Sequence, residues 1–169
     1  GPDLMSPTST AANFAKLSIF FPMWNEQDYI RRTIGFATEI CEVLVADGEI
    51  GDYELVIVDD ASTDDTGAIA DALAAEDPHV HVVHHETNRK LGGSIKTGLA
   101  ACTGDIVLYT DADLPFDMAE LSRAFRILRN YEADIISAYR LDRTGEGLRR
   151  TVYSFVYNGL VTAGFGVRF

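Results

Sequence analysis

The sequence lacks several features that would place it quickly in a class of protein. No stretch reaches the roughly 20 consecutive apolar residues needed to span a bilayer. The most apolar segment, residues 151–167, contains Asn158 and three glycines. No internal repeat or low-complexity linker is present, and 169 residues suffice for one hydrophobic core. We therefore expect a single globular domain.

Cysteine is scarce, and its positions argue against a metal site. The two cysteines, Cys41 and Cys102, lie in apolar helical patterns rather than in a metal-ligand spacing. We expect buried, reduced thiols, as in a cytosolic protein. The segment from His81 to His84 alternates like a strand, so the histidines do not favour a zinc site either.

Positive charge is also in deficit, and its distribution is uneven. The chain has 14 basic against 26 acidic residues and a net charge of −12, which argues against a nucleic-acid partner. Residues 140–169 differ, with five arginines and two acids. Such a locally positive segment fits either an anionic ligand or a solvated helix end.

Apolar runs alternate with helical patterns along the chain. We expect strands at residues 17–22, 53–60, 80–85, 106–111 and 133–140. We expect helices at 26–45, 64–76, after the glycines of 86–105, at 116–132, and from Gly147–Leu148 onward. This order predicts an α/β fold with a mostly parallel sheet and helices on both faces. The domain is expected to cover residues 17–169, after a cloning scar and a disordered tail at 1–16.

The expected strands all end in polar residues. Ligands of open α/β sheets bind beyond the carboxyl ends of the strands, so these residues should share one edge. Gly92 and Gly93 open a helix beside Lys90, a pattern that favours phosphate. The first strand is followed by "PMWNEQ" rather than G-x-G-x-x-G, which excludes a dinucleotide oxidoreductase.

Asp111 and Asp113 follow the fourth expected strand as a D-x-D pair. Two carboxylates so close repel each other unless a cation lies between them. Mg²⁺ or Mn²⁺ prefers such oxygen ligands, although a simple strand-end turn would also use aspartate. Phosphatases with a D-x-D nucleophile carry the motif on the first strand, which excludes that class here.

Five motifs in this order resemble the family 2 glycosyltransferases. They are "FPMWNE" (21–26), "VIVDDASTDDT" (56–66), "NRKLGGSIKTGL" (88–99), "GDIVLYTDADL" (104–114) and "SAYR…RR…S…N" (137–158). The sequence is most similar to polyprenyl-phosphate sugar synthases of the dolichol-phosphate mannose or glucose synthase type. The resemblance implies a Rossmann-like GT-A fold, here apparently truncated at the C-terminus.

The resemblance also implies site residues. Those for the nucleotide sugar are Pro22, Trp24, Asn25, Glu26, Asp59, Asp60, Lys90, Gly92, Asp111 and Ala112. Those for the metal are Asp111 and Asp113, and Pro115 stands where many members have a further metal-binding glutamine. Those for the acceptor phosphate are Arg140, Arg149, Arg150 and Ser154, and Asp111, Asp113 and Arg140 are the catalytic candidates. Arginine suits this task because its planar fork binds phosphate oxygens in pairs.

The implied reaction is an inverting, metal-dependent transfer of a hexose from a GDP- or UDP-sugar to a polyprenyl or dolichyl phosphate. The alternatives are transfer to a sugar hydroxyl in polysaccharide synthesis and a non-catalytic nucleotide-binding fragment. An amphipathic C-terminal helix with Val152, Val156 and Leu160 on one face would fit either a bilayer surface or the core. We expect a protein on the cytoplasmic side, peripheral to a membrane or anchored through parts outside this chain.

Overall fold

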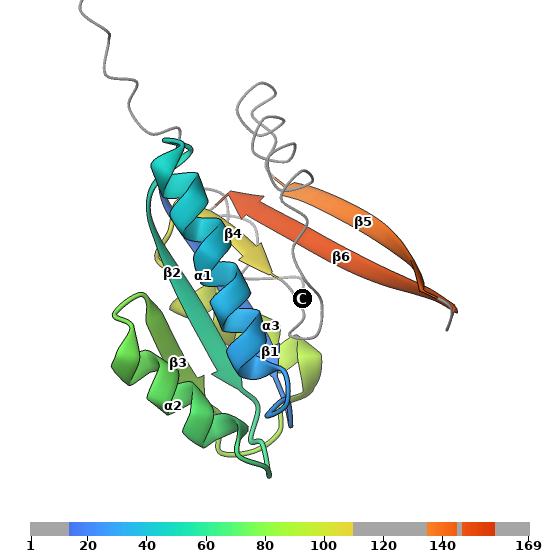
Figure 1. The fold of residues 1–169 in the computed structure, drawn as a ribbon. Helices are drawn as coiled ribbons and strands as arrows, with labels where there is room; N and C mark the ends of the chain where they lie inside the picture. Colours follow the sequence, from blue (N-terminus) through green and yellow to red (C-terminus); the bar gives the residue numbers. More distant parts are fainter. Residues whose placement is uncertain (1–13, 110–134, 145–146, 158–169) are drawn as a thin grey trace, which may run out of the picture.

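The computed structural model describes residues 14–109 in full, and the backbone of residues 135–144 and 147–157. The helices are α1 (Ile30–Ala46), α2 (Thr66–Glu76) and α3 (Lys90–Ala101). The strands are β1 (Phe14–Met23), β2 (Ile50–Asp59), β3 (Val80–His84), β4 (Ile106–Tyr109), β5 (Ile135–Thr144) and β6 (Gly147–Tyr157). Figure 1 shows their arrangement around a single sheet.

The sheet has six strands in the order β3-β2-β1-β4-β6-β5. Strands β1 to β4 run parallel, whereas β6 is antiparallel to both β4 and β5. The four parallel strands therefore bring their carboxyl ends to one edge, as the sequence predicted. Together with the helices they form the expected α/β fold with a mostly parallel sheet.

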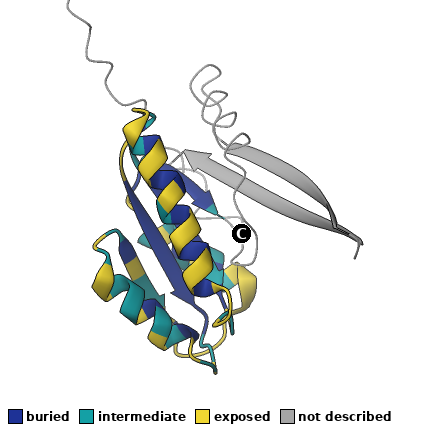
Figure 2. Cartoon of the chain, in the orientation of Figure 1, coloured by how far each residue is buried: buried dark blue, intermediate teal, exposed yellow. Residues whose placement is uncertain are grey.

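Both faces of the parallel strands are covered by helices. Alternate side chains of each strand point to opposite sides, so each strand contributes to two cores. One core contains Leu17, Ile19, Leu55 and Ile57 and packs against α1 and α2. The other contains Phe20, Val56 and Val107 and packs against α3. In Figure 2 the strands beneath α1 are buried, while the outer face of α1 is exposed. The helices are thus on both faces, as expected.

The helix expected from Gly147–Leu148 is wrong, because residues 147–157 form strand β6. This segment is rich in threonine, valine, tyrosine and phenylalanine, which favour strands. It pairs with the free edge of β4, from Ile106↔Tyr157 to Tyr109↔Ser154. The amphipathic helical face that would have included Val152 and Val156 is therefore not formed.

Other differences concern element boundaries. β1 begins at Phe14 instead of residue 17, since residues 14–16 continue the pairing with β2. The expected helix at 116–132 and residues 1–13 lie outside the described residues. Cys41 and Cys102 are buried free thiols, as expected. In the part of the chain that the structure describes, no helix combines the length and apolarity required to cross a membrane.

Candidate functional site

Three loops meet at the carboxyl edge of the sheet, one after each of β1, β2 and β3. A non-glycine residue with positive φ lies in each of the first two loops, Asn25 at 54° and Ala61 at 59°, and a third, Lys90 at 62°, begins α3 directly after the third loop. They are the non-glycine residues with positive φ within the described residues. Such backbone conformations are unfavourable for L-residues and concentrate at functional sites. The strained backbone thus marks the edge at which the sequence placed a ligand.

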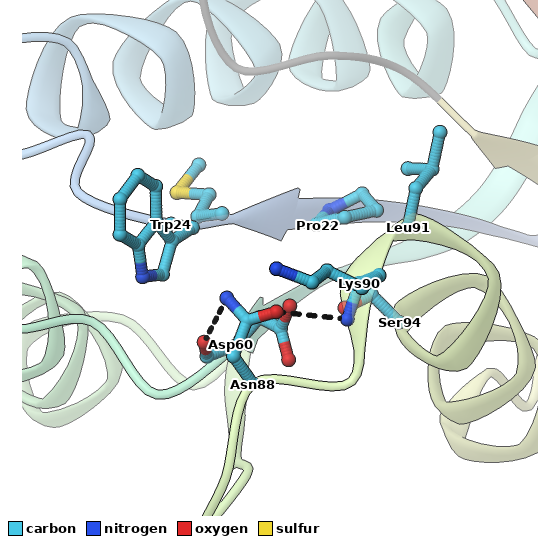
Figure 3. Close-up of a pocket in the computed structure, with 8 residues that line it drawn as sticks. Pro22, Trp24, Asp60, Asn88, Lys90, Leu91 and Ser94 are labelled. Atoms are coloured by element: carbon cyan, nitrogen blue, oxygen red, sulfur yellow. Dashed lines mark hydrogen bonds between the residues drawn. The ribbon is translucent and has the colours of Figure 1, made fainter.

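A pocket of about 280 Å³ opens between these loops and the start of α3. It is lined by Pro22, Met23, Trp24, Asp60, Asn88, Lys90, Leu91 and Ser94. Figure 3 shows the Trp24 indole on one side, Leu91 on the other, and the Lys90 side chain extending between Trp24 and Asp60. Trp24 and Leu91 are both about half exposed, at 52% and 54%. The pocket therefore combines apolar walls with one cationic and one anionic group.

Asp60 is held at the pocket wall by a buried network. Its backbone N–H donates to Met23 O at 2.9 Å, which extends the β1–β2 pairing past the strand end. Its Oδ1 accepts from Arg89 N at 2.7 Å and pairs with His85 Nδ1 at 2.8 Å, and His85 Nε2 lies 2.7 Å from the Thr97 hydroxyl. Burial alone would raise the pKa of this carboxyl, but the hydrogen bonds from Arg89 and His85 lower it below its ordinary value. Asp60 is therefore a fixed, ionised acceptor.

The neighbouring Asp59 has a different task. Its Oδ1 accepts from Ser62 N at 3.1 Å and its Oδ2 pairs with His84 Nδ1 at 2.8 Å. His84 Nε2 also contacts Asp71 Oδ1 on α2 at 2.7 Å. The hydrogen bonds to Asp71 and Asp59 raise the pKa of His84. Asp59 is not one of the described residues that line the pocket. Of the two aspartates predicted to contact the nucleotide sugar at the end of β2, only Asp60 lies at the pocket wall.

Asn25 and Glu26 organise the loops beside the pocket. Asn25 Oδ1 accepts from Thr63 N at 2.8 Å, and Asn25 N donates to the Ser62 hydroxyl at 3.1 Å. The backbone N–H of Glu26 donates to the Thr66 hydroxyl at 2.8 Å. The loop after β1 and the loop after β2 are thereby fastened together. In the described part of the pocket wall neither Asn25 nor Glu26 takes part.

Helix α3 contributes three lining residues on one face, Lys90, Leu91 and Ser94. Of these, only Lys90 was predicted; Gly92 is not among the described lining residues. Sequence reasoning also missed Asn88, whereas Met23 belongs to the motif "FPMWNE" on which the resemblance placed the nucleotide site. The helical spacing of three and four residues from Leu91 and Lys90 to Ser94 was a signal that could have identified Ser94. Asn88 holds the loop, because its amide donates to Asp60 O and its Oδ1 accepts from Lys90 N.

The metal and acceptor candidates are described less completely. Asp111, Ala112 and Asp113 lie outside the described residues. The chain leaves β4 at Tyr109, which pairs with Phe20 of β1, at the edge where the pocket opens. Within residues 14–109, no cluster of three or more His, Cys, Asp or Glu side chains could hold a metal ion.

The predicted acceptor residues lie on the backbone of the β5–β6 hairpin. The register pairs Arg140 with Thr151, Arg150 with Leu141, Arg149 with Asp142 and Ser154 with Ser137. Since neighbouring positions along a strand face opposite sides, Arg149 and Arg150 belong to opposite faces of the hairpin. Position 151 pairs with Arg140 and lies two residues after Arg149 on β6. Positions 140 and 149 therefore belong to the same face of the hairpin.

The pocket suits a planar, hydrogen-bonding group attached to an anion. Pro22, Met23, Trp24 and Leu91 provide apolar surface for a ring, and an aromatic wall favours stacking. The ionised Asp60 accepts N–H or O–H groups and repels phosphate. The Lys90 ammonium attracts negative charge, and it makes no ion pair with the side chains that the structure describes. These are the requirements of a nucleotide.

Comparisons with known proteins agree with this chemistry. The chain is 33% identical over 159 residues to the glycosyltransferase AglD of Haloferax volcanii, covering 92% of this chain and 25% of that protein. It is 32% identical over 155 residues to the undecaprenyl-phosphate 4-deoxy-4-formamido-L-arabinose transferase of Sodalis glossinidius, covering 90% and 45%. The chain thus spans less than half the length of these relatives.

Solved structures share the fold. The mannosyltransferase PcManGT of Pyrobaculum calidifontis, in complex with GDP-Man and Mn²⁺, matches with a TM-score of 0.68 at 21% identity, over 94% of this chain and 50% of that one. TarS 1–349 of S. aureus with UDP gives 0.68 at 20%, over 87% and 48%. The model of the family described as "Glycosyl transferase family 2" matches residues 18–165. The chain belongs to glycosyl transferase family 2, a family of transferase enzymes with the GT-A fold.

Proposed function

We propose that this chain binds the sugar nucleotide of a hexosyltransferase that glycosylates a polyprenyl phosphate. The observation that carries the proposal is the pocket in which the Asp60 carboxylate and the Lys90 ammonium lie among apolar walls. It has the acceptor, the cation and the ring surface that a nucleoside diphosphate needs. The names of AglD and of the undecaprenyl-phosphate transferase support this reaction class.

The donor is a GDP- or UDP-hexose in this proposal. Asp60 accepts a hydrogen bond from the nucleoside, and Trp24 and Pro22 flank its ring. Lys90 lies beside the diphosphate and offsets the negative charge that grows as the sugar–phosphate bond breaks. Asn25 and Asp59 act indirectly, since they hold the loops on which the contacting residues are carried.

Asp111 and Asp113 are the proposed ligands of a Mg²⁺ or Mn²⁺ ion. Their carboxylate oxygens are of the type that these ions prefer, and they follow the end of β4 by two and four residues. When bound, the metal would neutralise charge on the departing nucleoside diphosphate. The crystal complex of PcManGT contains Mn²⁺, which supports a metal in this fold.

The candidates for the acceptor phosphate, Arg140, Arg149, Arg150 and Ser154, all lie on the β5–β6 hairpin. We propose that the phosphate binds on one face of it, with either Arg140 and Arg149 or Arg150 and Ser154. An acceptor phosphate is already anionic, so its attack on the anomeric carbon needs no strong general base, and in-line attack inverts that carbon. Such an acceptor places the protein at the cytoplasmic surface of a membrane. Residues 17–169 would form one catalytic domain with an incomplete acceptor side.

The test is calorimetric titration of the chain with a panel of GDP- and UDP-sugars, with and without Mn²⁺. We expect one nucleotide to bind, and Asp113→Ala to remove the effect of Mn²⁺. Asp65→Ala is the matched control, since Asp65 is exposed and lies outside the pocket wall among the described residues. Failure of every nucleotide to bind, or unchanged Mn²⁺ dependence in Asp113→Ala, would contradict the proposal.

The acceptor requires a transfer assay with the full-length protein. Arg149→Ala combined with Arg150→Ala should leave nucleotide affinity unchanged and raise the KM for polyprenyl phosphate. Labelled hexose recovered on an oligosaccharide instead of the lipid would favour the sugar-hydroxyl alternative. Binding without any transfer would favour the non-catalytic one.

A further inference from the structure

Ser94 presents a hydroxyl that the fold does not use. The residue is 1% exposed, and its Oγ is the single buried side-chain N or O atom without a hydrogen-bond partner in the part of the chain that the structure describes. Buried hydroxyl groups almost always have a partner, because burial without one is unfavourable. Ser94 also lines the pocket, so a ligand there could supply the missing partner.

A second buried serine shows what a structural hydroxyl looks like in this fold. Ser18, on β1, is 0% exposed. Its Oγ donates to Glu54 Oε1 at 2.7 Å and accepts from Gly104 N at 2.7 Å. Ser18 thus completes the polar network at the opposite end of the sheet. Ser94 has the same burial but no comparable network, which separates its role from that of Ser18.

The surroundings of Ser94 indicate which part of a nucleotide it meets. Phosphate is disfavoured next to the ionised Asp60, whereas the apolar surfaces of Pro22, Met23 and Trp24 suit the faces of a planar base. A volume of about 280 Å³ has room for the base end of a nucleotide rather than for a whole sugar nucleotide. Asp60 can only accept a hydrogen bond, while the Ser94 hydroxyl can donate one.

We propose that Ser94 donates a hydrogen bond to one exocyclic carbonyl oxygen of the donor's base, O4 of uracil or O6 of guanine, whose adjacent ring N–H is bound by Asp60. Uracil and guanine share this N–H beside a C=O. Ser94 would then be a residue that determines base specificity. This inference rests on the proposed function, because it assumes that a nucleoside diphosphate occupies the pocket.

The experiment compares wild type, Ser94→Ala and Ser18→Ala by calorimetric titration in Mn²⁺. The ligands are UDP, 4-thio-UDP, GDP and 6-thio-GDP, since replacing the carbonyl oxygen by sulfur leaves a much weaker acceptor. For the nucleotide that wild type prefers, Ser94→Ala should lower the affinity about threefold to tenfold, the range for one hydrogen bond. For the thio analogue, wild type and Ser94→Ala should bind with equal affinity.

Thermal unfolding without nucleotide provides a second readout. Ser94→Ala should unfold at the same or a higher Tm, because it removes a hydroxyl that has no protein partner. Ser18→Ala should show the opposite profile, with a lower Tm and an unchanged preference for oxygen over sulfur in the ligand. The two variants together distinguish a ligand-directed hydroxyl from a structural one.

The outcomes separate the two proposals. In one case wild type binds UDP or GDP, and Ser94→Ala lowers the affinities for the nucleotide and for its thio analogue equally, or lowers neither. Either result would overturn the role of Ser94 and leave the donor site standing. If wild type binds none of the four nucleotides, the donor site itself is overturned. Loss of affinity for the oxygen ligand alone supports the inference.

Discussion

Replacement of Asp60 by asparagine should separate ligand binding from folding. In the wild type, Asp60 Oδ1 accepts hydrogen bonds from Arg89 N and from His85 Nδ1, and the backbone N–H of Lys90 also helps to lower the pKa of the carboxyl. Asparagine can keep its carbonyl oxygen toward Arg89 and His85. Its amide NH₂ then stands where the second carboxylate oxygen was, so an acceptor becomes a donor.

The size of the effect follows from this exchange. A hydrogen bond to a charged group contributes about 1.5–3 kcal/mol, so the affinity for the preferred nucleoside diphosphate should fall about 10- to 150-fold. The free energy of unfolding should fall by only about 1 kcal/mol, because the Asp60→Asn side chain keeps Arg89 and His85 as partners and loses their charge assistance.

Titration calorimetry and urea unfolding of the same samples measure the two quantities. Asp65→Asn is the control for a lost negative charge near the site, and it should change neither. Wild-type affinity in the Asp60→Asn variant would refute the placement of the nucleoside against Asp60. A large loss of folding free energy would refute the separation of the two roles.

Two further predictions concern the stability of the fold. Hydrogen bonds to Asp71 and Asp59 raise the pKa of His84 in the folded protein. The resulting stabilisation is fully present below the pKa of the unfolded state and is lost as the pH rises through the pKa of the folded state. Urea unfolding between about pH 6 and 8 should therefore show falling stability, and His84→Gln should flatten this slope; an unchanged slope would contradict the assignment. In α3, a Cβ at Gly98 would collide with the Phe20 ring, so Gly98→Ala should lower the free energy of unfolding by about 1–3 kcal/mol. Gly92→Ala, with open space around its Cβ, should stabilise α3 by up to about 1 kcal/mol, and equal effects of the two alanines would contradict the packing.

The parallel part of the fold was predictable because its signals are local. The runs that became β1 to β4 are apolar over several residues and end in polar groups, as strands buried on both faces do. The segment 147–157 was harder, because its apolar residues fit a helix as well as a strand. Pairing with β4 and β5 decided between them, and these partners are distant in the sequence.

At the site, the sequence predicted the edge but not the role of each residue. Asp59 and Asp60 are adjacent and chemically identical, and either could have faced a ligand. Both carboxylate oxygens of Asp59 form hydrogen bonds, to Ser62 and to His84. Hydrogen bonds from His85 and Arg89 hold Asp60 at the pocket wall. Neighbouring residues at a strand end point to opposite faces, so what packs on each face determines their roles.

The sequence by itself determined the class of fold, the edge of the sheet at which the pocket lies and the family motifs, since all three follow from local patterns and their order. Only the tertiary structure decided that Asn25 fastens two loops, that Asp60 rather than Asp59 lines the pocket, and that Ser94 lies in it without a partner. These properties depend on contacts between segments far apart in the chain. Spacing along a sequence does not reveal which polar groups the fold leaves unsatisfied.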